Sequence, residues 1–131
     1  MLGDVIELSI AVRDLEAAIK HFESVFELKV HHRGESKEFG FINAILPLGR
    51  GHIELLQPTD TSSAVGRFLE TRGEGVYLVG FDTEDIPASA GKLRDRGVKV
   101  TEGRPDFPIA WVHPGDAHGV FIELRKPEQY S

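Results

Sequence analysis

No cysteine occurs among the 131 residues of this chain. Disulfide bonds and thiolate chemistry are therefore excluded, and cysteine usage does not indicate a compartment. No apolar run reaches the roughly 18 residues of a membrane-spanning helix. The N-terminus also lacks a basic stretch followed by an apolar one, which is the pattern of a signal peptide. We therefore expect no membrane span, no signal peptide and a cytoplasmic protein.

The chain also lacks an excess of basic residues. Its 15 Lys and Arg are outnumbered by 21 Asp and Glu, so the formal net charge is −6. Nucleic acids and anionic membranes select proteins with clustered positive charge, so neither is an expected partner. The hydrophobic content of 40% and charged content of 27% are ordinary for a globular protein. We expect one domain over residues 1–131.

What the chain does contain is an internal repeat. Residues 53–58, IELLQP, match residues 122–127, IELRKP, at four of six positions, with Glu54 and Glu123 separated by 69 positions. Two further landmarks recur in the same order with nearly the same offset. They are Asp14-Leu15 with Asp85-Ile86, and Leu28-Lys29-Val30 with Val98-Lys99-Val100. Such self-similarity predicts two copies of one module.

The first module covers about residues 5–57. Its first strand, Val5–Val12, has an apolar face containing Leu8, which we expect to pack on a helix. Its mixed face contains Glu7 and Ser9 and should meet solvent or a cavity. Asp14 is the expected N-cap of a helix that ends near Phe26. Three strands follow, at Leu28–His32, Phe39–Leu46 and His52–Gln57, and residues 47–51 form the last turn.

A linker over residues 58–75 contains a short helix at 64–71, and the second module covers about residues 76–126. It repeats the order of strand, helix and three strands. Pro87 lies in the first turn of the helix, where proline is tolerated, and Gly97 ends the helix. One such module cannot bury both faces of its sheet. The sequence therefore predicts an α+β fold of two βαβββ modules, with a sheet curled around a shared cleft and the helices outside.

Five segments resemble the vicinal oxygen chelate superfamily, which includes glyoxalases and bleomycin-resistance proteins, and within it the methylmalonyl-CoA epimerases. The similarity covers residues 5–126. It implies a homodimer with a divalent metal in the cleft, and isomerase or lyase chemistry through an enolate. The segments are SIAVRDLEAAIKHFESVFELKV, LPLGRGHIELLQPTD, VGRFLETRGEGVY, RDRGVKV and HPGDAHGVFIEL.

The resemblance also implies where site residues lie. The metal-ligand positions of the family lie on the first and last strand of each module, at Glu7, Glu54, Leu78 and Glu123, and the expected ligands are the three glutamates. The family usually has histidine at the positions of Glu7 and Leu78, and leucine cannot bind a metal. Glu123 and Asn43 occupy the catalytic positions, but an amide such as that of Asn43 cannot serve as a general base.

Three glutamates facing one cleft leave two interpretations open. Their carboxylates repel one another and burial raises their pKa values, so either a cation neutralises them or the cleft is wet and holds no metal. If Glu7, Glu54 and Glu123 do bind a metal, their oxygen ligands favour Mg²⁺, Mn²⁺ or Ca²⁺ over Zn²⁺, Co²⁺ or Ni²⁺.

The remaining cleft residues are expected to contact a small-molecule ligand. Arg125 shares a face with Glu123, and it pairs either with a substrate carboxylate or with a nearby acid. The predicted substrate-binding residues are Phe41, His52, Leu78, Phe121 and Arg125, and the rest of the inferred lining comes from Phe39, Ile45, Leu56 and Gly80.

Two functions follow from these residues. In the first, the protein is an epimerase-like enzyme that acts on an acyl-CoA or similar carbonyl compound, with altered or absent metal-dependent activity. In the second, it is a non-catalytic protein that binds or sequesters a small molecule, as bleomycin-resistance proteins do.

Overall fold

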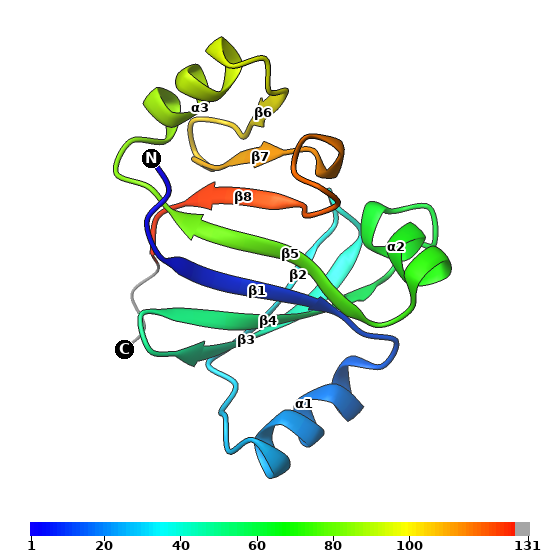
Figure 1. Cartoon of the computed structure of the whole chain (residues 1–131). Coiled ribbons are helices and arrows are strands. Elements are labelled where there is room, and N and C mark those ends of the chain that lie inside the picture. The colour runs from blue at the N-terminus through cyan, green and yellow to red at the C-terminus, as the bar shows by residue number, and fades with distance from the viewer. Residues whose placement is uncertain (128–131) are drawn as a thin grey trace. The chain divides into compact units, whose positions relative to one another are not determined.

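The structure of the protein, a computed structural model, describes residues 1–127. It is an α+β fold in which a mixed eight-stranded sheet has the strand order β2-β3-β4-β1-β5-β8-β7-β6 (Figure 1). The strand, helix and three-strand order occurs twice, with α2 between the copies, which confirms the predicted fold. The elements are β1 (Val5–Ala11), α1 (Leu15–Val25), β2 (His32–Ser36), β3 (Phe41–Leu48), β4 (Gly51–Pro58), α2 (Ala64–Arg72), β5 (Gly75–Asp82), α3 (Ile86–Asp95), β6 (Val100–Glu102), β7 (Ala110–Val112) and β8 (Ile122–Arg125).

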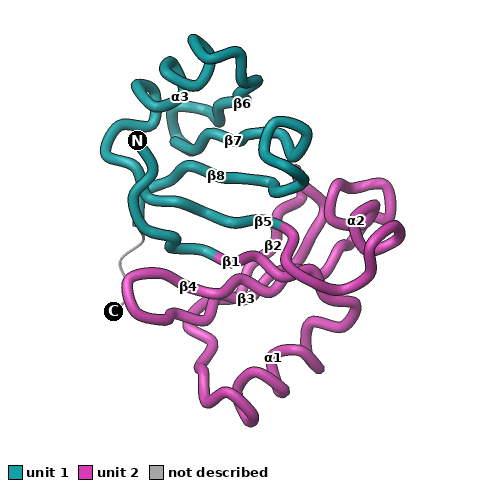
Figure 2. Tube along the Cα trace, viewed as in Figure 1, with its two compact units in different colours: residues 1–7, 78–129 teal, residues 8–77, 130–131 magenta. Residues whose placement is uncertain are grey.

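The chain forms two compact units (Figure 2). Unit 1 contains Met1–Glu7 and the described chain from Leu78 onward, and unit 2 contains Leu8–Tyr77. Strand β1 is therefore divided, with its first residues in unit 1 and its last in unit 2. The predicted module bounds follow the repeat in the sequence, and together with the predicted single domain and shared cleft they stay predictions.

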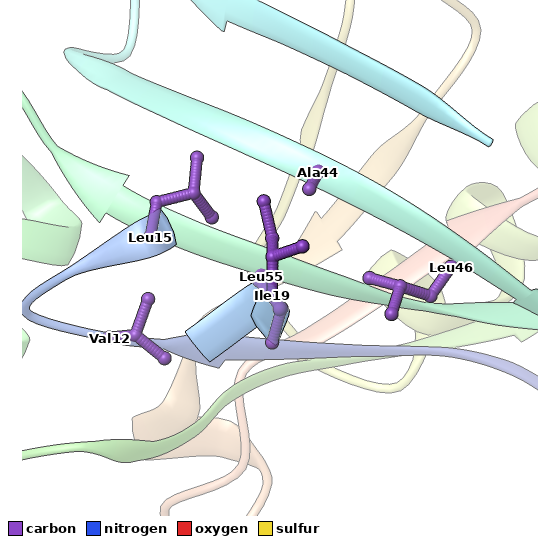
Figure 3. Close-up of a cluster of buried hydrophobic side chains, with 6 residues drawn as sticks. All are labelled: Val12, Leu15, Ile19, Ala44, Leu46 and Leu55. Atoms are coloured by element: carbon purple, nitrogen blue, oxygen red, sulfur yellow. The ribbon is translucent and has the colours of Figure 1, made fainter. Parts of the chain in front are cut away.

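One buried apolar cluster of unit 2 lies between α1 and strands β3 and β4. Leu15 and Ile19 of α1 belong to one buried cluster with Leu46 and Leu55 of the strands, and the last two side chains are fully buried (Figure 3). The spacing of Leu15 and Ile19 by one helical turn places both on the same face of the helix. The predicted amphipathic helix is confirmed.

Unit 1 repeats this local structure at equivalent positions. Asp14 (φ −135°, ψ 103°) and Asp85 (φ −139°, ψ 102°) both N-cap their helices. Each carboxylate accepts a hydrogen bond from the backbone N–H three residues later, at 3.0 Å for Asp14 and 2.9 Å for Asp85. Leu124 is as fully buried as its counterpart Leu55. The repeat predicted from the sequence is therefore present in the backbone conformation and in the cores.

The strand predicted at 28–32 lies instead at His32–Ser36. Its side chains are polar, and the strand is formed by pairing with β3, in which His32 lies opposite Ile45. The turn predicted at 47–51 is also shorter than expected. Pro47 still belongs to β3 and lies opposite His52, while Gly49 makes the turn with a φ of 57°. Phe39 was predicted to begin the strand that the structure places at β3, but it lies before β3 and is exposed.

Leu8 is the residue of the apolar face of β1 that differs from the prediction, since Ile6 and Val12 on the predicted face are buried. Leu8, expected to pack on a helix, is 37% exposed, whereas Glu7 and Ser9 on the mixed face are only 3% and 1% exposed. Buried polar groups require hydrogen-bond partners, so Glu7 and Ser9 are each expected to belong to a polar cluster. No helix within residues 1–127 has the length and hydrophobicity needed to cross a bilayer.

Candidate functional site

Unit 1 contains a buried ionic cluster made of Glu7, Glu123 and Arg125. The Arg125 Nη1 donates hydrogen bonds to Glu7 Oε2 at 2.9 Å and to Glu123 Oε2 at 3.2 Å. The three side chains are 13% exposed for Arg125, 3% for Glu7 and 8% for Glu123. Glu123 and Arg125 share a face of β8 because they are two residues apart. Of the two interpretations of Arg125, the structure has the pairing with nearby acids.

Trp111 completes the bonding of Glu123 within unit 1. Its indole Nε1 donates to Glu123 Oε1 at 2.9 Å, because Trp111 on β7 lies directly opposite Glu123 on β8. Both carboxyl oxygens of Glu123 are thus bonded, which fixes the orientation of the group. Reasoning from the sequence did not identify Trp111. The signal that could have identified Trp111 is its position on the strand that precedes the strand of Glu123.

The pKa of Glu123 is raised well above its ordinary value. Burial of the carboxyl group is the main cause, followed by the charge of Glu7 and a hydrogen bond with Glu7, while Arg125 and Trp111 act in the opposite direction. A proton on Glu123 leaves one carboxylate and one guanidinium in the cluster, so its formal charge is zero. A carboxyl group of this kind can donate and accept protons closer to neutral pH than an exposed glutamate can.

Gly80 on β5 provides the space for this cluster. It lies beside Glu123 in the parallel pairing of β5 with β8. A Cβ atom at this position would lie 2.7 Å from the Cβ of Glu7, 3.1 Å from its Oε1 and 3.4 Å from the Cδ of Arg125. Any side chain at Gly80 would therefore displace Glu7 from its position, since the nearest atom belongs to the rigid start of that side chain.

Unit 2 contains a separate polar cluster around Glu54. Ser9 Oγ donates to Glu54 Oε1 at 2.8 Å, and Asn43 Nδ2 donates to Glu54 Oε2 at 2.6 Å. These two hydrogen bonds orient the carboxylate of Glu54. Asn43, predicted at a catalytic position, acts here as a hydrogen-bond donor. Ser9 was not predicted as a site residue, although it shares the mixed face of β1 with Glu7.

The other predicted binding residues occupy different surroundings. His52 and Leu78 are buried, and Phe121 is half-buried with its carbonyl accepting from Val79 N at 3.0 Å. Phe41 packs against the apolar cluster of Leu56 and its neighbours in unit 2. Contact with a substrate stays a prediction for all of these residues.

The residues present do not fit the divalent metal that the resemblance implies. Leu78 offers no donor atom, and Glu7 and Glu123 are already paired with the Arg125 guanidinium. A permanent cation beside two carboxylates repels a divalent ion placed on the same oxygens. Within residues 1–127, no three His, Cys, Asp or Glu side chains are arranged to hold a metal ion. The convergence of Glu54 with Glu7 and Glu123 stays a prediction.

Comparison with known proteins decides the family. The sequence profile of the glyoxalase/bleomycin resistance protein/dioxygenase superfamily matches residues 7–110. This chain belongs to that superfamily. Among similar superfamily members, the ethylmalonyl-CoA/methylmalonyl-CoA epimerase of Cereibacter sphaeroides is 29% identical over 133 residues, covering 96% of this chain and 99% of that protein. The human mitochondrial methylmalonyl-CoA epimerase is 28% identical over 131 residues, covering 95% and 74%.

Solved structures of the superfamily agree with this assignment. A variant of Streptomyces coelicolor methylmalonyl-CoA epimerase in complex with 2-nitronate-propionyl-CoA superposes with a TM-score of 0.89 at 32% identity, covering 98% of this chain and all of that chain. The Mycobacterium tuberculosis methylmalonyl-CoA epimerase gives a TM-score of 0.87 at 30% identity, covering 98% and 90%. The resemblance inferred from the sequence is confirmed.

Proposed function

We propose that this protein binds an acyl-CoA thioester and transfers a proton at the carbon beside the thioester carbonyl, as an epimerase-like enzyme with altered chemistry. The observation that carries the proposal is the similarity over nearly the whole chain to an epimerase in complex with an acyl-CoA analogue. A carboxyl group at Glu123, buried and oriented by Trp111, is the proposed proton-transfer group. Its raised pKa suits this role.

Asn43 limits the reaction that Glu123 can perform. Inversion at a carbon requires that a proton leave from one side and return to the other, and one carboxyl group serves only one side. The Asn43 amide has no useful proton affinity, and it donates its hydrogen bond to Glu54. We therefore expect proton exchange with solvent to be faster than epimerisation.

Incubation with methylmalonyl-CoA in D₂O, followed by NMR, measures this exchange, and a stereospecific assay measures epimerisation. Glu123→Gln keeps the shape of the side chain and removes its acid–base function, so exchange should fall by about a hundredfold or more. Glu70→Gln, on an exposed position of α2, is the control and should leave the rate unchanged. Equal exchange rates in wild type and Glu123→Gln would contradict the role of Glu123.

Asn43 also favours a second candidate, which is binding without turnover. Isothermal titration with methylmalonyl-CoA separates the two functions. Binding accompanied by exchange supports the enzyme, and binding without exchange supports a sequestering protein. Absence of binding to methylmalonyl-CoA and to propionyl-CoA would overturn both.

We further propose that the protein assembles as a homodimer, as the resemblance implies. Light scattering coupled to size-exclusion chromatography measures the mass of the assembly, against 14.5 kDa for one chain. A monomeric mass over the working concentration range would refute the dimer.

A further inference from the structure

We propose that the guanidinium of Arg125 is a built-in cation that takes the place of a divalent metal between Glu7 and Glu123, so that this part of the site is complete without a metal ion. The inference concerns the ionic cluster of unit 1 alone. It does not depend on the identity of the substrate, and it can fail or hold independently of the proposed function.

The geometry of the cluster is that of a cation shared by two ligands. One nitrogen of Arg125, Nη1, bonds to an oxygen of Glu7 and to an oxygen of Glu123. Hydrogen bonds between charged groups are about twice as strong as neutral ones. The two acids come from positions 118 and two residues away in the chain. Arg125 therefore connects the first strand of the protein to its last.

Burial prevents a divalent ion from binding beside Arg125. The three side chains are almost fully removed from solvent, where an unpaired charge is costly, and the charge of Arg125 compensates the acids of the cluster. Arginine keeps its positive charge at every pH at which proteins are folded, so Arg125 cannot lose its charge to admit another cation. A divalent ion would have to displace the side chain.

The repeat shows that the fold itself does not require arginine at this position. The counterpart of Arg125 in the first module is Leu56, 69 positions earlier. Leu56 is 3% exposed and belongs to an apolar cluster with Ala11, Val65 and Leu69. An apolar residue thus satisfies the same strand position in the other copy. The arginine is accounted for by the two acids that it contacts.

Gly80 supports the same conclusion. The space that a Cβ atom would need at this position is taken by Glu7 and by the stem of Arg125. The missing side chain on β5 allows the ion pair to lie against the strand. Three positions on three strands, Gly80, Glu7 and Arg125, are thus mutually adapted.

The test compares metal binding by the wild type and by Arg125→Met, which keeps much of the side-chain volume and removes the cation. After treatment with EDTA, isothermal titration with Mn²⁺ and with Co²⁺ measures binding, and thermal unfolding with and without each ion measures stabilisation. The wild type should show no binding heat and no metal-dependent shift in Tm. Arg125→Met should have a lower Tm, bind Mn²⁺ at least about tenfold more tightly than the wild type and regain stability with Mn²⁺.

Arg125→Lys is the matched control, since it keeps a positive charge and should remain insensitive to both ions. If Arg125→Met does not fold, the double variant Arg125→Met with Glu7→Gln removes one negative charge together with the cation and should fold. Tight metal binding by the wild type would overturn the inference. So would a folded Arg125→Met that gains no metal affinity, or a double variant that is as unstable as Arg125→Met alone.

Discussion

The side-chain amide of Asn43 donates a hydrogen bond of 2.6 Å to Glu54, and so orients a carboxylate on β4 of unit 2. An amide and a carboxylate have nearly the same shape, but the amide NH₂ donates hydrogen bonds whereas an ionised carboxylate only accepts them. Asn43 can therefore donate to Glu54, whereas an ionised acid at position 43 has no hydrogen to donate.

Asn43→Asp should accordingly destabilise the protein in a pH-dependent manner. Two carboxylates at this separation repel, and the lost hydrogen bond to a charged group costs about 1–3 kcal/mol at pH 8. The loss should be smaller near pH 5, where the pair can share a proton. Urea denaturation at the two pH values measures the difference. An equal loss at both would show that packing, rather than charge, is responsible.

Gly80→Ala should destabilise unit 1 and disturb the ionic cluster. The added Cβ would meet the Cβ of Glu7 at 2.7 Å, and overpacking of this kind costs about 1–3 kcal/mol. Gly91→Ala is the matched control. It lies within α3, where an added Cβ meets nothing within 4 Å, so it should stabilise the helix by up to about 1 kcal/mol. Urea denaturation compares the two. Equal effects would contradict the close approach at Gly80.

Stability should depend on the ionisation of Glu123. Its pKa is raised in the folded protein above the ordinary value of 4.5, so the folded state binds this proton more tightly than the unfolded state does. The resulting stabilisation is fully present below the unfolded pKa and is lost as the pH rises through the folded pKa. Glu123→Gln should remove this decrease. The free energy of unfolding of both proteins, measured from about pH 4 to about pH 8, checks the slope.

The fluorescence of the protein should report the same proton. Trp111 is the only tryptophan, and its indole donates a hydrogen bond to Glu123. Ionisation of Glu123 places a negative charge beside the indole, so emission should change as the pH crosses the raised pKa. The change should be absent in Glu123→Gln. A titration that persists in this variant would assign the signal to another group.

The fold could be predicted because its signals are local and occur twice. Asp14 and Asp85 are capping residues followed by apolar residues at helical spacing, and Leu55 and Leu124 recur at one offset. The strand at His32–Ser36 could not be predicted in this way. Its residues are polar and lack an alternating pattern, so only pairing with β3 defines it.

The positions of the acidic site residues could be predicted from the sequence, but the side chains that they contact could not. The repeat and the resemblance together selected Glu7, Glu54 and Glu123. The sequence left open whether Arg125 pairs with a substrate or with an acid, because its bond to Glu7 joins residues 118 positions apart. Ser9 was missed because a serine on a strand carries no distinctive signal.

The ion pair between Glu7 and Arg125 joins two positions whose counterparts are both leucine. Leu78 stands where the first module has Glu7, and Leu56 stands where the second module has Arg125. A chain built from two identical copies of either module would therefore contain only one partner of the pair. The charge pairing therefore depends on the difference between the two copies. Exchanging Glu7 for leucine and Arg125 for leucine together would restore the symmetry and remove the ion pair in one step.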